Sequence, residues 1–401
     1  IVPDINNLPD GGKANYKEIR NVDILDLLSR PEIKLDPETC KYLTGETVLV
    51  TGGGGSIGSE LCRQIAKYAP KKIIIFDIYE NNAYTLKQAL DRHYFGSPEI
   101  IIRIGSVRDK ARLREVFEEF HPSSVFHAAA HKHVPLMEDS PFEAIKNNTL
   151  GTYNTAECAN EYKASHFVLL STDKAVNPTN VMGATKRMAE LVLQSLADAQ
   201  AVDFSAIDET EGQPPISNRT RFCMVRFGNV LGSSGSVVPL FRKQLRQGGP
   251  LTVTHTEVTR YFMTIPEAAQ LVLQAGAMGQ DGEVFVLDMG QPVKIIDLAK
   301  RMVELSGLQV QDDSHPEGDI AIKVVGLRSG EKLYEELLIG ENPEPTSHPR
   351  IMKAHENFLS WPDLLPDLLA IRAAAKDGNI EKIQQTLGKL VSGYKANDCL
   401  T

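Results

Sequence analysis

The feature that most restricts the fold is a run of glycines between an apolar segment of strand length and a helical pattern. The segment Thr47–Thr51 leads directly into Gly52-Gly53-Gly54-Gly55-Ser56-Ile57-Gly58. Gly52, Gly55 and Gly58 have the G-x-x-G-x-x-G spacing, which differs by one residue from the commonest dinucleotide fingerprint. Glycines let the backbone approach a pyrophosphate, and the N-terminus of the next helix offers N–H groups to it. The run predicts a dinucleotide-binding loop; the alternative is a tight turn without a ligand.

Strands alternate with helices along the first half of the chain. Short β-branched or aromatic segments predict strands at Thr47–Thr51, Lys72–Asp77, Ile100–Ile104, Ser124–His127, Phe167–Ser171 and Phe222–Arg226. Helical patterns occupy Ser59–Tyr68, Lys110–Glu119, Asn148–Tyr162 and Ala184–Ala197. Because alternating elements build a parallel sheet covered on both faces, we expect an α/β fold with a doubly wound parallel sheet of the Rossmann type.

The acidic residue that ends the second strand bears on the choice of dinucleotide. Asp77 lies 19 residues after Gly58, about where a carboxylate would accept from the adenosine ribose 2′-hydroxyl. A 2′-phosphate would be repelled there, and Ile78-Tyr79-Glu80 brings no arginine. The sequence therefore favours NAD over NADP, with a strand-end cap as the alternative role of Asp77.

Composition excludes several classes of protein. With 43 Lys plus Arg against 52 Asp plus Glu, the net charge is −9, and no basic run predicts a nucleic-acid partner. The five cysteines, Cys40, Cys62, Cys158, Cys223 and Cys399, lack metal-ligand spacing, so we expect reduced packing residues and no metal site. No segment has the ~20 apolar residues of a membrane span. These features indicate a cytoplasmic chain.

The chain changes character after Arg226, where loops and short segments replace the alternating pattern. We expect an N-terminal arm or linker over 1–44 and a dinucleotide-binding domain over 45–226 with parts of 255–290. A smaller, discontinuous substrate lobe would cover 227–350, and a helical tail would cover 351–401. The acidic, proline-containing insertion 198–220 is expected to be a solvated loop.

Polar residues follow the fifth predicted strand, where substrates approach a nicotinamide ring in such folds. Ser171-Thr172-Asp173-Lys174 places an acid beside an amine, and Val181-Met182-Gly183-Ala184-Thr185-Lys186 follows. An ordinary surface ion pair is the alternative for Asp173 and Lys174. His127 ends an apolar strand and is expected to be a core histidine.

Further segments carry a family resemblance. They are His127-Ala128-Ala129-Ala130-His131-Lys132-His133-Val134-Pro135, Asn147-Asn148-Thr149-Leu150-Gly151, Arg226-Phe227-Gly228-Asn229-Val230-Leu231-Gly232, Arg260-Tyr261-Phe262-Met263-Thr264 and Gly326-Leu327-Arg328-Ser329-Gly330-Glu331-Lys332. With the glycine run, they make residues 20–350 resemble UDP-N-acetylglucosamine 4,6-dehydratases of the CapD-like polysaccharide-biosynthesis family, which are extended short-chain dehydrogenases/reductases. Many members carry N-terminal membrane helices, so we expect the native protein at the cytoplasmic face of the bacterial inner membrane, held by a region upstream of Ile1.

The resemblance implies a reaction and a role for each catalytic candidate. Hydride would leave C4 of the sugar for NAD and later return to C6. Lys174 would remove the C5 proton, Asp173 would donate to the departing C6 hydroxyl, and Thr172 would hydrogen-bond O4. Lys186 would hold the nicotinamide ribose. Met182 stands where most of the superfamily has a catalytic tyrosine, and the long membrane-anchored subgroup is similar in having methionine there. The identity of the base that deprotonates the C4 hydroxyl is therefore left open. The stereochemical outcome at C5 is left open as well.

The resemblance also implies two sets of binding residues. The cofactor set is Gly52, Gly55, Ser56, Ile57, Gly58, Asp77, Ser106, Val107, Ala128, Ala129, Ala130, Asn147 and Lys186. The set for the UDP-sugar is Lys132, His133, Asn229, Val237, Val238, Thr252, Thr254, Arg260, Arg328 and Glu331. Guanidinium groups suit a diphosphate because their donors form a fork.

Two other functions remain open at this point. A UDP-sugar 4-epimerase shares the fold and the first hydride step, but it needs no acid–base pair for elimination and normally uses the tyrosine that Met182 replaces. A non-catalytic NAD-binding regulator would keep the fold and lose the chemistry. The resemblance leaves room for a homodimer or a higher homo-oligomer.

Overall fold

The computed structural model describes residue 27 and residues 38–208, 214–337 and 343–394. As far as they are described, Glu32–Gly228, Ile265–Gly290 and Ser329–Thr401 form a larger compact unit, and Asn229–Thr264 and Gln291–Arg328 form a smaller one. The expected arm over 1–44 lies mostly outside the described residues. Cys40, Cys62, Cys158 and Cys223 are buried thiols, and Cys399 is not described.

The larger unit is built on a mixed sheet in the order β17-β18-β13-β8-β5-β4-β1-β2-β3, counted over the described ranges. All strands from β13 to β3 run parallel, which confirms the doubly wound prediction. The strands are β1 (Thr47–Thr51), β2 (Lys72–Asp77), β3 (Glu99–Ile104), β4 (Ser124–His127), β5 (His166–Leu170), β8 (Arg221–Arg226), β13 (Glu283–Leu287), β17 (Glu344–Pro345) and β18 (Ile351–Ala354). Strand order reverses between β1 and β4, which is where such sheets bind ligands.

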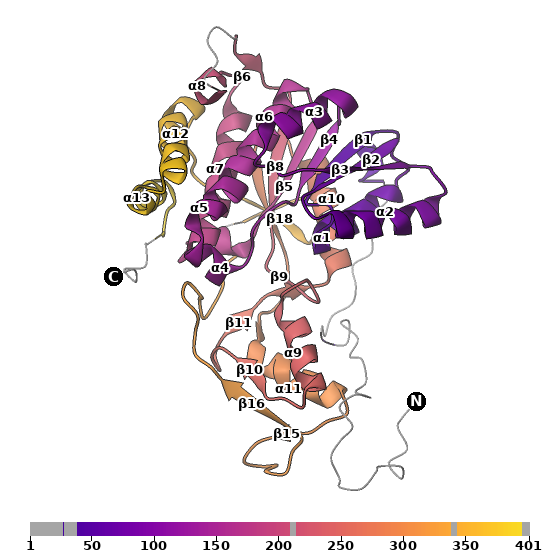
Figure 1. The fold of residues 1–401 in the computed structure, drawn as a ribbon, viewed down its shortest axis with the longest axis vertical. Coiled ribbons are helices and arrows are strands. Elements are labelled where there is room, and N and C mark those ends of the chain that lie inside the picture. Colours follow the sequence, from indigo (N-terminus) through magenta and orange to yellow (C-terminus); the bar gives the residue numbers. More distant parts are fainter. Residues whose placement is uncertain (1–26, 28–37, 209–213, 338–342, 395–401) are drawn as a thin grey trace. The chain divides into compact units, whose positions relative to one another are not determined.

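Helices cover both faces of this sheet (Figure 1). One layer holds α1 (Ser56–Ala66), α2 (Glu80–Tyr94) and α10 (Ile265–Met278), and the other holds α3 (Lys110–Phe120), α6 (Gly151–Glu161) and α7 (Val181–Asp198). The short elements α4 (Val134–Asp139), α5 (Pro141–Ala144) and the π-helical turn η5 (Ile145–Leu150) precede α6. The 3₁₀ turns are η4 (Lys41–Leu43) and η6 (Asp173–Ala175). The inner residues of β1, β2 and β4 are buried on both faces, which explains their nearly continuous apolar runs.

The C-terminal segment belongs to the larger unit and is not helical throughout. Its first residues form β18, which pairs antiparallel with β13 and adds an antiparallel edge to the sheet. Helices α12 (Trp361–Asp377) and α13 (Ile380–Leu390) follow and pack on α7, outside the helical layer. Trp361, Leu364 and Leu368 are buried in the same apolar core as α6 and α7.

The expectation of a solvated loop over 198–220 is wrong for part of the insertion. Strands β6 (Ala201–Val202) and β7 (Ile216–Ser217) pair antiparallel, and the short helix α8 (Ser205–Asp208) follows β6. Val202, Phe204 and Ile207 are buried in the main core. The Phe204 ring lies 6.2 Å from both the Tyr153 ring and the Trp361 ring. An aromatic side chain can bury a large area in a stretch that reads as polar overall.

The smaller unit combines short strands with two amphipathic helices. β10 (Leu251–Val253) pairs with β16 (Ile320–Val324), β15 (Val310–Gln311) with β16, β11 (Thr259–Arg260) with β14 (Val293–Lys294), and β9 (Asn229–Val230) with β12 (Phe262–Met263). Its helices are α9 (Val237–Arg246) and α11 (Ile295–Leu305). Buried Phe241, Leu245 and Leu298 show that both helices turn an apolar face inward.

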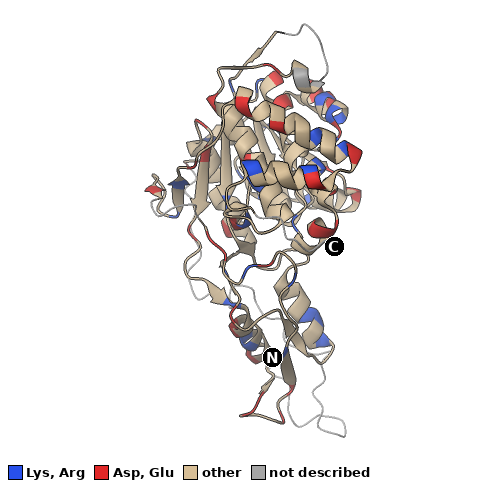
Figure 2. Cartoon of the chain, turned by 90° about the vertical axis from the view of Figure 1, so that its left-hand side faces the viewer, with Lys and Arg blue, Asp and Glu red and all other residues tan. Residues whose placement is uncertain are grey.

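Charges of both signs are intermixed on the helices of the larger unit (Figure 2). Among the residues that the structure describes, no helix has the length and apolar character of a membrane span.

Candidate active site

The glycine run forms a tight strand-to-helix turn at the point where strand order reverses. Gly52 has φ +65°, and a Cβ built there would lie 2.6 Å from the Ala129 nitrogen. A Cβ on Gly58 would lie 2.1 Å from the Gly52 carbonyl oxygen, because α1 begins at Ser56 and its first turn sits directly on the loop. Only glycine permits both approaches. The first turn of α1, with Ser56 and Ile57, therefore has its N-terminus at the carboxyl edge of the sheet, an arrangement that suits a pyrophosphate.

Asp77 ends β2 beside this loop. Its Oδ2 accepts from the Gly54 N–H at 2.8 Å and its Oδ1 accepts from the Tyr79 N–H at 2.8 Å. The second bond is the strand-end cap that the sequence offered as an alternative. A carboxylate has about four lone-pair positions, so these two bonds leave capacity for ribose hydroxyls. The two roles are compatible.

The other cofactor candidates lie at neighbouring strand ends. Ser106 and Val107 follow β3, Ala128–Ala130 follow β4, and Asn147 lies in η5. Val107 is held against α6, because its carbonyl accepts from Asn154 at 3.1 Å and its side chain leaves no room for a Cβ on Gly151. These placements bring the predicted set to one edge of the sheet.

Thr172, Asp173 and Lys174 form a cluster at the end of β5, in which Asp173 is buried and the other two residues are half-buried. The Asp173 side chain is fully buried, and its Oδ1 accepts from the Thr172 hydroxyl and from Lys174 Nζ, both at 2.9 Å. The Lys174 side chain is 18% exposed. Burial of this kind argues against an ordinary surface ion pair. No described residue hydrogen-bonds to Asp173 Oδ2, although that oxygen is buried.

A second carboxyl group reaches the same amine and was missed at the sequence level. Glu335 Oε1 lies 3.7 Å from Lys174 Nζ, and the Glu335 side chain is 4% exposed. The preceding segment is held in place because the Gly330 carbonyl accepts from Thr179 and Asn180, and Lys332 Nζ donates to the Val176 carbonyl. Within a run of charged residues, nothing local distinguishes Glu335.

Helix α7 carries the remaining catalytic candidates. Met182 is buried in a small apolar cluster with Met137, Ala144 and Val181, so its side chain packs rather than titrates. Lys186 Nζ donates to the Leu170 carbonyl at 2.7 Å. Burial lowers the pKa of Lys186 to about 8, with Glu190 opposing the shift. His127 is the core histidine expected: it bonds Thr51 and Thr152, and burial, with a smaller effect of Lys186, lowers its pKa to about 3.

The loop with Lys132 and His133 is connected to α7 by Asn148, a residue of the segment Asn147–Gly151 for which the sequence alone indicates no role. Asn148 Oδ1 accepts from the His131 N–H at 2.8 Å, and Asn148 Nδ2 donates to the His131 carbonyl and to the Thr185 hydroxyl. Burial lowers the pKa of Lys132, and burial with the neighbouring Lys132 lowers that of His133.

The UDP-sugar candidates are divided between the two units. Lys132, His133 and Glu331 belong to the larger unit, and the smaller unit holds Asn229, Val237, Val238, Thr252, Thr254, Arg260 and Arg328. Val238 is fully buried, so only its backbone could face a ligand. The Thr252 hydroxyl accepts from Gln244 at 2.7 Å. Arg260 is buried and donates to the Thr259 carbonyl.

Beneath the cluster lies a buried network of two arginines and two glutamates. Arg226 on β8 bonds Glu190 on α7 and Glu356 after β18. Arg187 lies 3.0 Å from both glutamates. Glu190 Oε1 also accepts from the Ser171 hydroxyl at 2.6 Å, immediately before Thr172. Despite its burial, Glu190 has its pKa lowered to about 2 by Arg226 and Arg187. The network therefore anchors the backbone that presents the catalytic candidates.

The doubly wound sheet has a glycine-rich loop after β1 and a helix that carries Lys186 after β5, and segments of a second, smaller unit interrupt the larger one. These features are those of the extended short-chain dehydrogenases/reductases. Within that class, the chain belongs to the family described as polysaccharide biosynthesis protein, which matches residues 48–356.

Three relatives illustrate the family. The capsular polysaccharide biosynthesis protein CapD of Staphylococcus aureus is 54% identical over 82% of this chain and 51% of its own length. The inverting UDP-N-acetylglucosamine 4,6-dehydratase of Campylobacter jejuni is 34% identical over 75% of this chain and 80% of its own. The UDP-glucose 4-epimerase of Rickettsia canadensis is 35% identical over 74% of this chain and 79% of its own length. The chain thus spans about half the length of CapD.

Proposed function

We propose that this chain catalyses the NAD-dependent 4,6-dehydration of UDP-N-acetylglucosamine to the 2-acetamido-2,6-dideoxy-hexos-4-ulose, for bacterial surface polysaccharide or glycan synthesis. The buried acid–amine pair carries the proposal. Asp173 Oδ1 accepts from two donors, whereas no described residue bonds its buried Oδ2. An isolated carboxyl oxygen in the interior is costly unless it meets a partner, and a substrate hydroxyl would supply one.

The residues at the sheet edge fit a dinucleotide. The close packing of Gly52 and Gly58 lets β1 turn directly into α1, so α1 directs its N-terminus to this edge, and Asp77 beside the loop keeps lone pairs for ribose hydroxyls. When bound, NAD would accept hydride from C4 of the sugar and supply it to C6. Lys186 would hold the nicotinamide-side ribose, and its buried position close to the Leu170 carbonyl supports that role.

The elimination of water requires a base and an acid on adjacent groups. Lys174 would take the proton from C5, and Asp173 would give a proton to the departing C6 hydroxyl. The Lys174 amine lies 2.9 Å from Asp173 and 3.7 Å from Glu335, so the proposed base and the proposed acid are in direct contact. Thr172 would hydrogen-bond O4, since Met182 has no proton to exchange.

The 4-epimerase remains the second candidate, because epimerases are among the relatives at a similar level of identity. An epimerase oxidises and reduces the same carbon, so it has no use for a base directed at C5. The buried Lys174–Asp173–Glu335 group is the observation against it.

The test is incubation of the NAD-loaded protein with UDP-N-acetylglucosamine, followed by mass spectrometry. A dehydratase gives a product lighter by one water, an epimerase gives an isomer of equal mass, and a regulator gives neither. Asp173→Asn should lower turnover by about 10² to 10⁴, the usual contribution of a general acid. Asp281→Asn, in an exposed loop before β13, is the matched control and should keep full turnover.

Lys174→Ala separates the steps of the reaction. Without the base at C5, solvent deuterium should no longer enter that position, while Lys376→Ala on the exposed side of α12 should incorporate it normally. Full dehydratase activity in both Asp173→Asn and Lys174→Ala would refute the proposal.

A further inference from the structure

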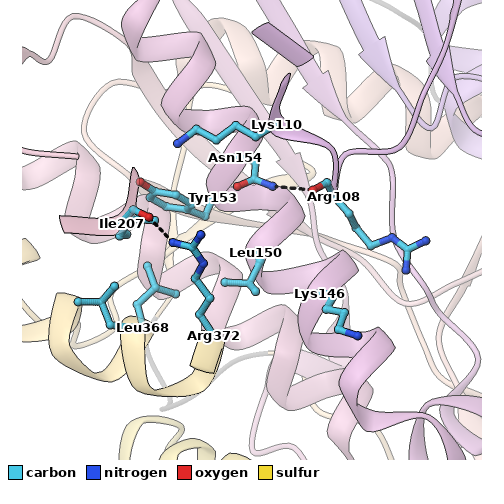
Figure 3. A pocket seen from close by; sticks show the side chains of 10 residues that line it. Arg108, Lys110, Lys146, Leu150, Tyr153, Asn154, Ile207, Leu368 and Arg372 are labelled. Atoms are coloured by element: carbon cyan, nitrogen blue, oxygen red, sulfur yellow. Dashed lines mark hydrogen bonds between the residues drawn. The ribbon is translucent and has the colours of Figure 1, made fainter. Parts of the chain in front are cut away.

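The larger unit contains a cavity that the proposed reaction does not use. Its volume is about 380 Å³, and it lies between the start of α3, the η5–α6 segment, α8 and α12 (Figure 3). None of its lining residues is among those expected to hold NAD or the UDP-sugar. The lining is Arg108, Lys110, Lys146, Leu150, Tyr153, Asn154, Ile207, Leu368, Leu369 and Arg372.

As far as the structure describes it, the lining is cationic and contains no carboxylate. Arg108 and Lys146 share Glu143 as their partner, and Lys110 shares Glu157 with Arg114. Both glutamates stand outside the lining. Arg372 is exposed and donates to a neutral group, the Ile207 carbonyl. Of the described side chains that line the cavity, four are cationic and none is acidic, which makes the cavity attractive to an anion.

The other part of the lining is apolar. Leu150 on η5, Ile207 on α8, and Leu368 and Leu369 on α12 supply aliphatic surface from three elements (Figure 3). Tyr153 is fixed by its stacking on Trp361 at 6.1 Å between centroids. A free phosphate ion would use the cations and leave this surface uncovered. A concave site of this size with aliphatic walls and a few charged groups suits a small organic ligand.

We propose that this cavity binds a nucleotide, with its phosphate among Arg108, Lys110, Lys146 and Arg372 and its base against the leucines. Arginine forms paired hydrogen bonds to phosphate, and Arg372 stands at the exposed side of the cavity. The site is separate from the glycine loop and would act as a regulatory site.

A physical connection links this cavity to the cofactor edge. Asn154, in the lining, donates to the Val107 carbonyl at 3.1 Å and to the Arg108 carbonyl at 3.4 Å. Val107 is one of the residues expected to bind the cofactor. A ligand that binds Arg108 therefore acts on the same short loop. The nucleotide in the cavity and NAD should each change the affinity for the other by the same factor. This linkage rests on the proposed function, whereas binding to the cavity does not.

The direct test is isothermal titration calorimetry with AMP, on protein saturated with NAD and UDP so that the catalytic site is filled. AMP should bind with one site per chain. Arg372→Ala should weaken binding about tenfold or more, the usual effect of losing a charge-assisted hydrogen bond. Lys376→Ala removes the same charge from the exposed side of α12 and should leave the affinity within a factor of two.

If Arg372→Ala does not fold, Lys146→Ala on η5 serves the same purpose, and thermal unfolding of each variant reports its integrity. Absence of AMP binding at millimolar concentration would overturn the proposal. So would equal loss in Arg372→Ala and Lys376→Ala, or tight binding of inorganic phosphate with no gain from the nucleoside. A shift in NAD affinity caused by AMP would support the linkage; if AMP binds while NAD affinity is unchanged, the site stands and the linkage is wrong.

Discussion

Replacing Gly183 by alanine should damage catalysis while leaving the protein folded. A Cβ at this position would lie 2.1 Å from the Lys174 carbonyl oxygen and 3.0 Å from Pro178 Cβ. Nonbonded heavy atoms normally stay about 3.5 Å apart, so α7 and the η6 turn must separate by about 1 Å. The displaced residue is Lys174 itself, and a misplacement of about 1 Å at a reacting group can cost ~10²-fold in rate.

The assay is steady-state dehydratase turnover together with thermal unfolding. Gly183→Ala should lower kcat by about 10² with little change in KM, because the nucleotide contacts lie elsewhere. Overpacking should also cost about 1–3 kcal/mol of stability. Gly388→Ala is the matched control: Gly388 is in α13 with no atom within 4 Å of the added Cβ, and it should gain up to ~1 kcal/mol without affecting kcat. A folded Gly183→Ala protein with kcat within threefold of the wild type would refute the reasoning.

Three further predictions follow from the same structure. Met182→Ala should keep substantial turnover, because this side chain only packs, whereas Lys186→Ala should lose far more; equal losses would give Met182 a chemical role. Cofactor extracted from the purified protein and identified by mass spectrometry should be mainly NAD, since Asp77 opposes a 2′-phosphate; recovery of NADP would contradict this. The folded-state pKa of Glu190 is lowered from 4.5 to about 2, so its stabilisation is present above pH 4.5 and disappears as the pH falls toward 2. Urea unfolding should show the wild type losing about 3 kcal/mol over that range relative to Glu190→Gln; parallel curves would exclude this coupling.

Local sequence signals were sufficient for the first half of the sheet. The predicted bounds of β1, β2 and β4 match the structure at both ends, those of β3 and β8 begin one residue late, and those of β5 are shifted by one residue at both ends. Except for the largely part-exposed β3, each of these strands is an apolar run bounded by turn residues and buried on both faces, so its own residues identify it as a strand. The glycine run was equally informative because its spacing needs both a strand before it and a helix after it.

The later strands were not predicted, because their partners are distant in sequence. Glu283–Leu287 and Ile351–Ala354 are short, and they become sheet strands only by pairing with β8 and with each other. The same holds for the insertion, where the burial of Phe204 depends on Trp361, more than 150 residues away. Burial that depends on a distant partner leaves no periodic signal in a short segment.

The candidate site shows the same division. Asp173 and Lys174 are adjacent in sequence and could be identified together, whereas Glu335 reaches their amine from a separate segment. Asn148 stood in a recognised motif, but its positioning contacts to His131 and Thr185 appear only in three dimensions. The sequence alone could not predict contacts between segments that lie far apart along the chain.

The buried arginine–glutamate network has a consequence for biosynthesis. Translation reaches Arg187, Glu190 and Arg226 long before Glu356. Between Arg226 and Glu356, two segments of the chain belong to the smaller unit. Until Glu356 emerges, two arginines share one glutamate, and a buried charge without its partner is strongly unfavourable. The core beside α7 should therefore close late, when β18 joins the sheet and delivers the second carboxylate. A nascent chain that stops short of this residue should remain sensitive to proteases around β8 and α7, even though most of the sheet has already been made.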